Sequence, residues 1–365
     1  MRKAVPAIER ITASALRIPT DAPEADGTFA WDRTTIVIVE ASAGGQTGLG
    51  YSYTGAAAAD LINGDLAPRL AGEDAFAIER AWERMVGAVR NLGWRGICAT
   101  AISAVDVALW DLKARLLDLP LVQLLGAVRD AVPIYGSGGF TSYAKERVAE
   151  QLGGWVAQEG CRFVKMKVGS DPDHDLDRAR AARDAIDGAE LFVDANGAYT
   201  RKQALAFAER YAELGVTWFE EPVSSDDLAG LRLMRDRGPA GMDIAAGEYG
   251  YEPDYFRRML EAGAVDVLQA DATRCGGITG FLRAAALADA HMVPLSAHTA
   301  PALHLHACCA APRLRHVEWF HDHVRIERML FDGAPVPERG LIRPNLTRPG
   351  HGLALKRAEA ARLAA

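Results

Sequence analysis

The sequence has few of the features that mark secreted, membrane-spanning or nucleic-acid-binding proteins. Only five of its 365 residues are cysteine, and no two of them form a CxxC pair. Scattered thiols in a long chain are typical of a reducing compartment, so we expect no disulfide framework. No apolar stretch reaches the length of a membrane span, and residues 1–20 lack the apolar core of a signal peptide. These absences predict a soluble, cytoplasmic protein.

A strong excess of charge is also missing. The formal net charge is -7 and is spread along the chain, so neither nucleic acid nor a membrane surface is expected as a partner. The sequence has no phosphate-binding P-loop, no GxGxxG fingerprint and no GxSxG elbow around a nucleophilic serine. The pairs Gly138-Gly139 and Gly276-Gly277 are therefore interpreted as tight turns.

The composition that remains, 49% apolar and 24% charged, is ordinary for a globular protein long enough for a large barrel or two domains. Residues 1–125 predict an α+β domain. Apolar, β-branched residues predict a strand at 34–41, and a second strand at 46–53 can return beside it. Helical periodicity follows at 56–64, 75–90 and 97–117. The segment 18–33 contains Pro, Asp, Gly and Thr without a clear period, and it is interpreted as a loop that serves as a lid.

From residue 126 onward, short apolar runs alternate with amphipathic helical stretches. Seven such pairs and an eighth run predict a (β/α)7β barrel of the TIM type, with residues 1–125 as its capping domain. The barrel is expected over 126–328, and the tail 329–365 is expected to pack back on the cap. The expected strands are 132–137, 163–168, 191–194, 217–220, 243–246, 265–269, 293–296 and 316–319, and the expected helices are 144–159, 174–185, 201–214, 226–236, 253–262, 278–289 and 301–310.

Three carboxylates stand at the C-terminal ends of three consecutive expected strands: Asp194, Glu220 and Glu248. The C-terminal ends of barrel strands line the active site. Three anions that converge in a low-dielectric mouth repel one another unless a cation lies between them. Oxygen ligands with open positions suit Mg²⁺, and Mn²⁺ is the alternative metal. Each acid alone could instead cap a helix or form a salt bridge, but the set of three favours a metal site.

Acid–base candidates flank these carboxylates. Lys165 and Lys167 are two residues apart on one expected strand, so both side chains point into the barrel, and each is expected to lower the pKa of the other. A solvated surface pair is the alternative, which the apolar neighbours argue against. His298 follows the seventh expected strand and Asp271 follows the sixth, so the carboxylate can orient the imidazole. A lone histidine is more often a core residue, and pairing with Asp271 favours the catalytic interpretation.

Several motifs occur in an order that resembles the enolase superfamily, specifically its mandelate-racemase-like subgroup. The helix at 101–121 resembles the segment that joins cap and barrel, and the resemblance covers the whole chain. The other motifs are VKMKVG at 164–169, FVDANGAYT at 192–200, WFEEPV at 218–223, AAGEYGYE at 245–252, VLQADATRCGGITG at 267–280, LSAHTAP at 295–301 and HVEWF at 316–320.

This resemblance implies roles for the residues that match the motifs. The three carboxylates become the Mg²⁺ ligands. Lys167 becomes the base on one face of the substrate, with Lys165 near the substrate carboxylate. His298, backed by Asp271, becomes the acid–base group on the opposite face.

Four further residues are candidates for substrate contact. The resemblance places Asn196 and Glu318 near the substrate hydroxyl or carboxylate, and a protonated Glu318 is hypothesised to donate a hydrogen bond there. Trp31 in the expected lid can pack on substrate carbons. His321 lies just beyond the last expected strand and is included for that reason.

The expected reaction starts with removal of the proton α to a carboxylate. The resemblance favours dehydration of an acid sugar, an aldonate or aldarate, to a 2-keto-3-deoxy acid, and the polar lid fits a polyol better than an aromatic ring. The alternative is a racemase or epimerase of an α-hydroxy acid, and a minor one is a barrel that binds a metabolite without catalysis. A small-molecule carboxylate is the expected partner, and a homo-oligomer, dimer or octamer, is the expected assembly.

Overall fold

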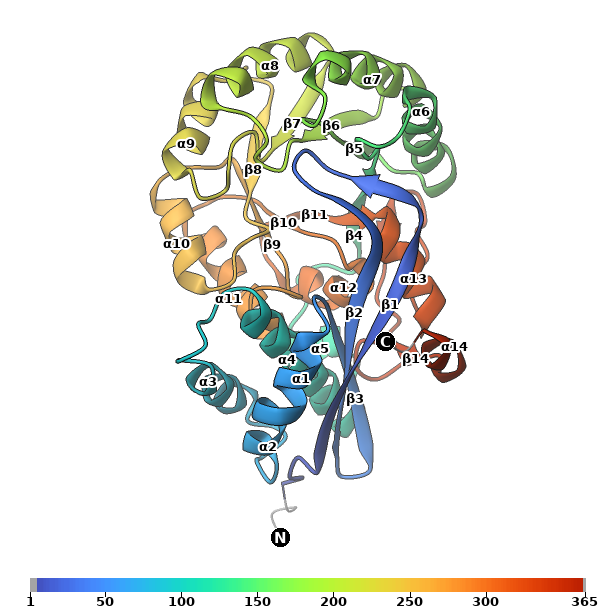
Figure 1. Cartoon of the computed structure of the whole chain (residues 1–365). Helices are drawn as coiled ribbons and strands as arrows, with labels where there is room; N and C mark the ends of the chain where they lie inside the picture. Colours follow the sequence, from blue (N-terminus) through green and yellow to red (C-terminus); the bar gives the residue numbers. More distant parts are fainter. Residues whose placement is uncertain (1–4, 364–365) are drawn as a thin grey trace.

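The computed structural model describes residues 5–363 and consists of a capping domain beside a closed barrel (Figure 1). The cap contains an antiparallel sheet in the order β1-β2-β3, as the α+β prediction required. Its strands are β1 (Arg10–Ala25), β2 (Ala30–Ala43) and β3 (Gln46–Tyr53). Its helical segments are α1 (Ala57–Leu61), η1 (Ile62–Leu66), α2 (Ala67–Leu70), α3 (Ile78–Ala88), α4 (Ile97–Leu116) and α5 (Leu121–Leu125).

The interpretation of residues 18–33 as a loop was wrong. β1 and β2 continue through this segment as a long hairpin, in which Pro19 pairs with Arg33 and, after an irregularity, Glu24 pairs with Trp31. β1 is an edge strand of its sheet, so the missing amide hydrogen of Pro19 leaves its pairing with Arg33 intact, whereas Pro23 lies in the stretch where the register shifts. The prolines interrupt the period-two pattern that predicts a strand from the sequence, but the strand itself continues through them.

The tip of this hairpin rests on the ends of the barrel strands (Figure 1). The amide of Thr141 donates to the carbonyl of Ala25 over 2.8 Å. A Cβ atom on Gly27 would lie 2.2 Å from the carbonyl oxygen of Ala195 and 2.7 Å from that of Val168. Only a residue without a side chain allows this approach. The hairpin is therefore held over the mouth of the barrel.

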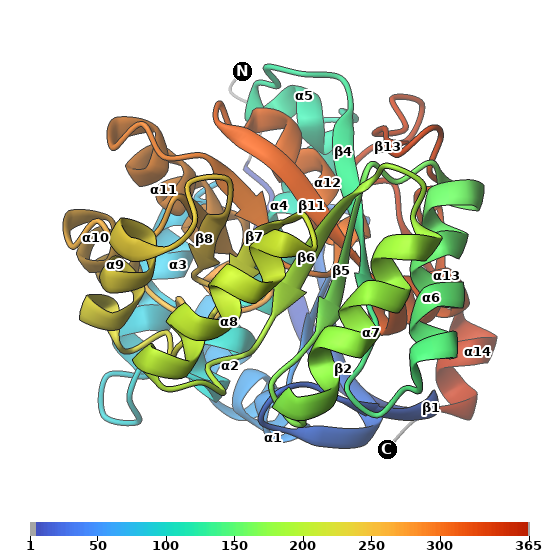
Figure 2. The same ribbon diagram turned by 90° about the horizontal axis from the view of Figure 1, so that it is seen from above.

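The barrel confirms the predicted (β/α)7β architecture. Its eight parallel strands run from β4 to β11, and β11 pairs with β4 to close the ring (Figure 2). A further helix, α13 (His321–Leu330), follows the eighth strand. The strands are β4 (Val132–Gly138), β5 (Phe163–Lys167), β6 (Glu190–Asp194), β7 (Val216–Glu220), β8 (Asp243–Ala246), β9 (Val267–Ala270), β10 (Leu295–Ala297) and β11 (Leu314–Phe320). The other helical segments are α6 (Lys145–Gly154), η2 (Trp155–Glu159), α7 (Pro172–Ala185), α8 (Arg201–Glu213), α9 (Leu228–Arg237), α10 (Pro253–Glu261), α11 (Gly277–Ala290) and α12 (Pro301–Ala310).

Large aromatic side chains fill the inside of the barrel. Tyr135, Phe192 and Trp218 are fully buried in one cluster, and the Phe192 and Trp218 rings stack with centroids 5.0 Å apart. Because side chains two apart on a strand point to the same side, Phe192 lies under Asp194 and Trp218 lies under Glu220. The polar residues at the strand ends thus lie directly on a buried aromatic layer.

The C-terminal tail contacts both domains. Its elements are β12 (Phe331–Asp332), β13 (Leu341–Ile342), β14 (Ala354–Leu355) and α14 (Arg357–Arg362). β13 pairs antiparallel with β4 of the barrel. On the cap, the amide of Arg17 donates to the carbonyl of Leu363 over 3.2 Å, and Arg357 forms an ion pair with Glu40. Among the described residues, no helix combines the length and apolarity that a membrane crossing needs.

One buried carboxyl group at the contact of cap and barrel gives a prediction about stability. Glu327 on α13 accepts hydrogen bonds from the Tyr51 hydroxyl (2.6 Å) and the Ala302 amide (3.1 Å). Burial raises the pKa of Glu327 from 4.5 to about 8. The folded state therefore holds this proton more tightly than the unfolded state, and the stability that it contributes is lost as the pH rises from about 4.5 through 8.

Glu327→Gln removes this titration while an amide can still donate to one neighbour and accept from the other. We expect the difference in the free energy of unfolding, variant minus wild type, to increase by about 1–4 kcal/mol between pH 5 and pH 8.5. Each pKa unit corresponds to about 1.4 kcal/mol. Urea unfolding at both pH values measures this gain, with the exposed Glu261→Gln as control. Parallel pH dependence of wild type and Glu327→Gln would contradict the prediction.

Candidate active site

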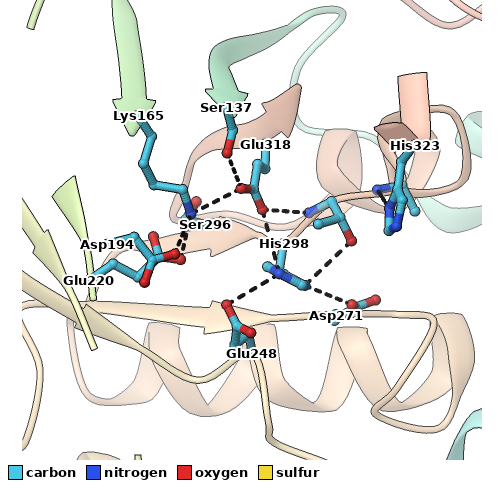
Figure 3. Close-up of polar contacts among 12 residues, drawn as sticks. Ser137, Lys165, Asp194, Glu220, Glu248, Asp271, Ser296, His298, Glu318 and His323 are labelled. Carbon is cyan, nitrogen blue, oxygen red and sulfur yellow. Dashed lines mark hydrogen bonds and ion pairs between the residues drawn. The ribbon is translucent and has the colours of Figure 1, made fainter. Parts of the chain in front are cut away.

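The three expected carboxylates and Lys165 converge at the C-terminal end of the barrel (Figure 3). Asp194, Glu220 and Glu248 each offer an oxygen atom within 4.8 Å of the others, and all three are buried. Lys167 Nζ donates to Asp194 Oδ2 over 2.5 Å. Lys165 Nζ lies 3.3 Å from the same oxygen and also contacts Glu220. The two lysines point into the barrel, as the alternation of strand side chains predicted.

The three carboxylates fit a divalent cation. Their donor set is oxygen only, which suits Mg²⁺. Glu248 Oε2 lies 3.2 Å from His298 Nε2, yet it accepts no well-directed hydrogen bond from any of the described residues. A buried carboxylate oxygen without a donor is costly unless a cation compensates it. The site therefore has the ligand type of a magnesium site and a buried carboxylate oxygen that can accept a further partner.

His298 and Asp271 form the expected pair. His298 Nδ1 lies 2.8 Å from Asp271 Oδ2, and its Nε2 points toward Glu248 and lies 3.6 Å from Glu318 Oε2 (Figure 3). Burial lowers the pKa of His298, but Glu248, Glu318 and Asp271 outweigh this effect and raise it to about 9. The imidazole is therefore protonated at neutral pH and can give a proton.

The pKa of Lys167 differs from the sequence expectation. Burial and the neighbouring Lys165 both lower the pKa of Lys167, as two buried lysines should. The carboxylate of Asp194, reinforced by Glu248 and Glu220, has the larger combined effect and raises this pKa above its usual value. Without a metal, the lysine is thus a cation held by Asp194.

Glu318 also differs from the hypothesis of a protonated donor. Its Oε1 accepts from the Ser137 hydroxyl over 2.5 Å and lies 2.9 Å from Lys165 Nζ. Its Oε2 accepts from the amide of Thr299 over 3.0 Å. Burial raises the pKa of Glu318, but the charges of Lys165 and His298 lower it to about 2. The carboxylate is ionised, and it links the lysine side of the site to the histidine side.

A cavity of about 330 Å³ lies between this cluster and the hairpin. Lys167, His298 and Glu318 line it from the barrel, together with Asn196. Trp31 lines it from β2, so the expected lid residue faces the site even though the lid is a hairpin. Asn196 has a positive φ of 45° and a buried Oδ1 that no other described residue contacts by hydrogen bond, which leaves this oxygen free for a ligand.

His321 lies apart from the residues that line this cavity. Its Nε2 is 2.9 Å from Asp21 Oδ2, in the contact between β1 of the hairpin and α13 of the barrel. His323, two residues later on α13, lines the cavity instead and stacks on Tyr53 with ring centroids 3.4 Å apart. The two imidazoles point in different directions because they are about half a helical turn apart. Which of them faces the cavity depends on the residue at which α13 begins, and the sequence alone does not give this residue.

Other residues of the site were not identified from the sequence. Arg274 lines the cavity, donates to the carbonyl of Glu248 over 3.1 Å and lies 3.4 Å from Asp271 Oδ2. Thr299 has a φ of 51°, a strained conformation for a β-branched residue that accompanies its hydrogen bond to Glu318. Arg274 belongs to the DATRCGG motif at 271–277. Its position three residues after Asp271 is the feature of the sequence that could have identified it as a site residue.

The fold is a closed parallel barrel with a capping domain. Three carboxylates lie at its mouth, beside a lysine pair and a His–Asp pair. Together these features define a metal-dependent barrel enzyme that acts on a carbon acid. The chain belongs to the mandelate racemase/muconate lactonizing enzyme family. Residues 12–126 match the family described as the mandelate racemase/muconate lactonizing enzyme N-terminal domain, and residues 147–360 match the enolase C-terminal domain-like family.

Two relatives of known activity are similar over most of their length. The 3,6-anhydro-alpha-L-galactonate cycloisomerase of Streptomyces coelicolor is 34% identical, with 98% of this chain and 99% of that enzyme covered. The L-talarate/galactarate dehydratase of Salmonella typhimurium is 33% identical, with 89% and 85% covered. A mutant L-talarate/galactarate dehydratase crystallised with Mg and L-glucarate has a TM-score of 0.89, with 29% identity and 99% and 93% of the chains covered.

A solved structure with higher identity extends the likeness of the fold. The mandelate racemase/muconate lactonizing enzyme-like protein from Rubrobacter xylanophilus is 54% identical, with a TM-score of 0.96. The alignment covers 99% of this chain and all of that chain (100%).

Proposed function

We propose that this protein catalyses the Mg²⁺-dependent dehydration of an acid sugar to a 2-keto-3-deoxy acid. The observation that carries the proposal is the shared cavity: Lys167 and His298 both line it, and the three carboxylates lie beside them. A site with a base, a protonated acid and a cation position matches the elements of an elimination next to a carboxylate. Relatives that are named dehydratases of acid sugars support this reaction class.

The side chains divide the reaction between them. Lys167, as the neutral amine, takes the proton from C2 as the C–H bond breaks, and the electron pair moves into the substrate carboxylate. His298 gives its proton to the hydroxyl on C3, which leaves as water when the C3–O bond breaks. The resulting enol gains a proton at C3 and loses the proton of its C2 hydroxyl to water, which gives the 2-keto-3-deoxy acid. Asp271 orients His298 for this transfer through the bond of 2.8 Å.

Asp194, Glu220 and Glu248 would hold the metal. Bound Mg²⁺ would supply positive charge that stabilises the negative charge developing on the substrate carboxylate, and it would reduce the effect of Asp194 on the pKa of Lys167. Lys165, which contacts Glu220 and Glu318, adds a second positive charge near the same position. The hairpin covers the cavity from the side of the cap, and Trp31 lines the cavity from β2.

The test is proton NMR in D₂O with Mg²⁺ and a panel of aldonates, aldarates and simple α-hydroxy acids. We expect one polyol acid to lose water and give a 2-keto-3-deoxy product. Conversion should disappear in Lys167→Ala, which lacks the base, and in His298→Asn, which lacks the acid. Deuterium incorporation at C2 with inversion and without loss of water would overturn dehydration in favour of racemisation or epimerisation.

A second candidate is an intramolecular elimination that opens a cyclic ether or lactone. It is favoured by the cycloisomerase of Streptomyces coelicolor, because the 34% identity extends over nearly the whole of both chains. The first step is the same, but the leaving oxygen stays attached to the product. Adding 3,6-anhydro-L-galactonate to the panel separates the two reactions: ring opening without release of water identifies the cycloisomerase.

A further inference from the structure

A second group of potential metal ligands lies outside the active site, between the hairpin and the barrel. Asp21 and Glu24 belong to β1, and His321 is the first residue of α13. One ligand atom from each residue lies within 4.8 Å of the other two. Asp21 and His321 are 300 positions apart in the sequence, and they come together only because the hairpin folds over the barrel. The proposed reaction uses none of them directly.

The clearest sign that this group lacks a partner is the carboxyl group of Glu24. The residue is only 1% exposed. Its Oε2 accepts a hydrogen bond from Trp31 Nε1 over 2.8 Å, whereas its Oε1 has no partner anywhere in residues 5–363. Burial and the nearby charge of Asp322 raise the pKa of Glu24 to about 8. Ionised, the group lacks a donor at Oε1, and protonated, it lacks an acceptor, so a bound cation would satisfy it better than either state.

The neighbouring charges leave this requirement unmet. Arg325 lies nearby, but its guanidinium donates to Asp322 and to the carbonyl of Pro19. Arg147 stacks on the Tyr143 ring and donates to its hydroxyl over 3.1 Å. Both arginines therefore direct their hydrogen bonds away from Glu24, whose charged neighbours include the carboxylates of Asp322 and Asp21.

The ligand types indicate which cation fits. Two carboxylates with one imidazole are typical of Zn²⁺ and related transition-metal ions, whereas Mg²⁺ prefers oxygen ligands alone. His321 Nε2 and Asp21 Oδ2 are 2.9 Å apart. Tetrahedral ligands at the usual Zn²⁺ bond lengths are about 3.3 Å apart, so small side-chain movements suffice. The Asp21 and His321 side chains are 41% and 24% exposed, which gives an ion a path from solvent and leaves room for water ligands.

We propose that Asp21, Glu24 and His321 form a second metal site, selective for Zn²⁺-like transition-metal ions, that fastens the β1–β2 hairpin to the barrel. The proposed site is connected to the catalytic cavity through Glu24. Its Oε2 accepts the hydrogen bond from Trp31, and Trp31 lines that cavity. An ion at this site therefore fixes the position of a residue above the substrate without contacting the substrate itself.

Calorimetric titration with Zn²⁺ in excess Mg²⁺ tests the proposal. The excess Mg²⁺ occupies the oxygen-only site, and we expect about one Zn²⁺ to bind per chain. Binding should weaken at least about 10-fold in His321→Gln and in Asp21→Asn, a half-exposed position where the change leaves the core intact. It should remain unchanged in His174→Gln. His174 is the matched control because it pairs with Asp171 over 2.9 Å, is 72% exposed and is not part of such a group.

Two spectroscopic readouts make the test independent of catalysis. Cu²⁺ bound in excess Mg²⁺ should show nitrogen hyperfine coupling in its EPR spectrum, and this coupling should be lost in His321→Gln. Hydrogen exchange in residues 18–33 should slow when Zn²⁺ is added and should not respond to Mg²⁺ alone. Equal Zn²⁺ affinity in the wild type and His321→Gln, or no Zn²⁺ binding in excess Mg²⁺, would overturn the proposal.

Discussion

Lys167→Ala should lower turnover by about 10³-fold or more and abolish exchange of the substrate α-proton in D₂O. Lys167 is the residue of the lysine pair that lines the cavity, so its loss removes the group that receives the proton. General-base catalysis typically contributes about 10²–10⁴-fold, and no other lysine of the cavity wall can replace it. Substrate binding should change much less, because the cation and the other cavity residues remain.

Two further variants distinguish the loss of the base from a loss of folding. Lys167 is buried against Asp194, and its removal leaves Asp194 Oδ2 with Lys165 at 3.3 Å. Lys167→Met keeps the aliphatic stem without the ammonium group, and Lys202→Ala removes an exposed lysine on α8. We expect both Lys167 variants to lose exchange and Lys202→Ala to keep full activity. Thermal unfolding and Mg²⁺ titration confirm that each variant is folded. Exchange at the wild-type rate in Lys167→Met would refute the assignment of Lys167 as the base.

Glu248→Gln should weaken Mg²⁺ binding by at least about 100-fold and reduce activity correspondingly. Replacing even an outer partner of a metal ligand costs about 10–100-fold in affinity, and Glu248 is expected to be a direct ligand. The amide conserves the volume and removes one negative charge from a group of three carboxylates. Calorimetric titration of the metal-free protein with Mg²⁺ measures the effect.

This substitution has a second consequence at His298. Glu248 is the largest source of the increase in the pKa of His298, so Glu248→Gln should shift that pKa downward. A histidine that is protonated up to a pH of about 9 in the wild type would then lose its proton at lower pH. NMR titration of the imidazole in the absence of metal measures this shift, and Glu261→Gln on the surface provides the control. Unchanged Mg²⁺ affinity together with an unchanged His298 titration would remove Glu248 from the site.

Much of the fold and of the candidate site followed from local sequence patterns. The alternation of short apolar runs with helical stretches predicted all eight barrel strands, since each strand and helix buries one face with its own period. Asp194, Glu220 and Glu248 could be grouped before the structure because they occupy equivalent positions at the ends of neighbouring parallel strands. The spacing of Lys165 and Lys167 predicted that both point inward, because strand side chains alternate.

The segment 18–33 shows where this reasoning failed. Pro19 and Pro23 remove the period-two signal, but the hydrogen-bonding partner of an edge strand lies on one side only. Nothing local to the segment indicates that its tip contacts the barrel at Ala195. The approach depends on Gly27 meeting a carbonyl group 168 positions later, a contact that only the assembled domains create.

The sequence by itself determined the architecture, the order of the candidate site residues around the barrel and the oxygen-only donor set of the proposed metal site. Strand alternation, helical period and position at a strand end are local properties, and a repeated local pattern is sufficient to fix them. Only the tertiary structure decided that Glu318 is ionised, that His323 rather than His321 faces the cavity and that Glu24 meets His321. These outcomes depend on distances between charges and on the direction of helix α13, and such quantities exist only after distant segments have packed together.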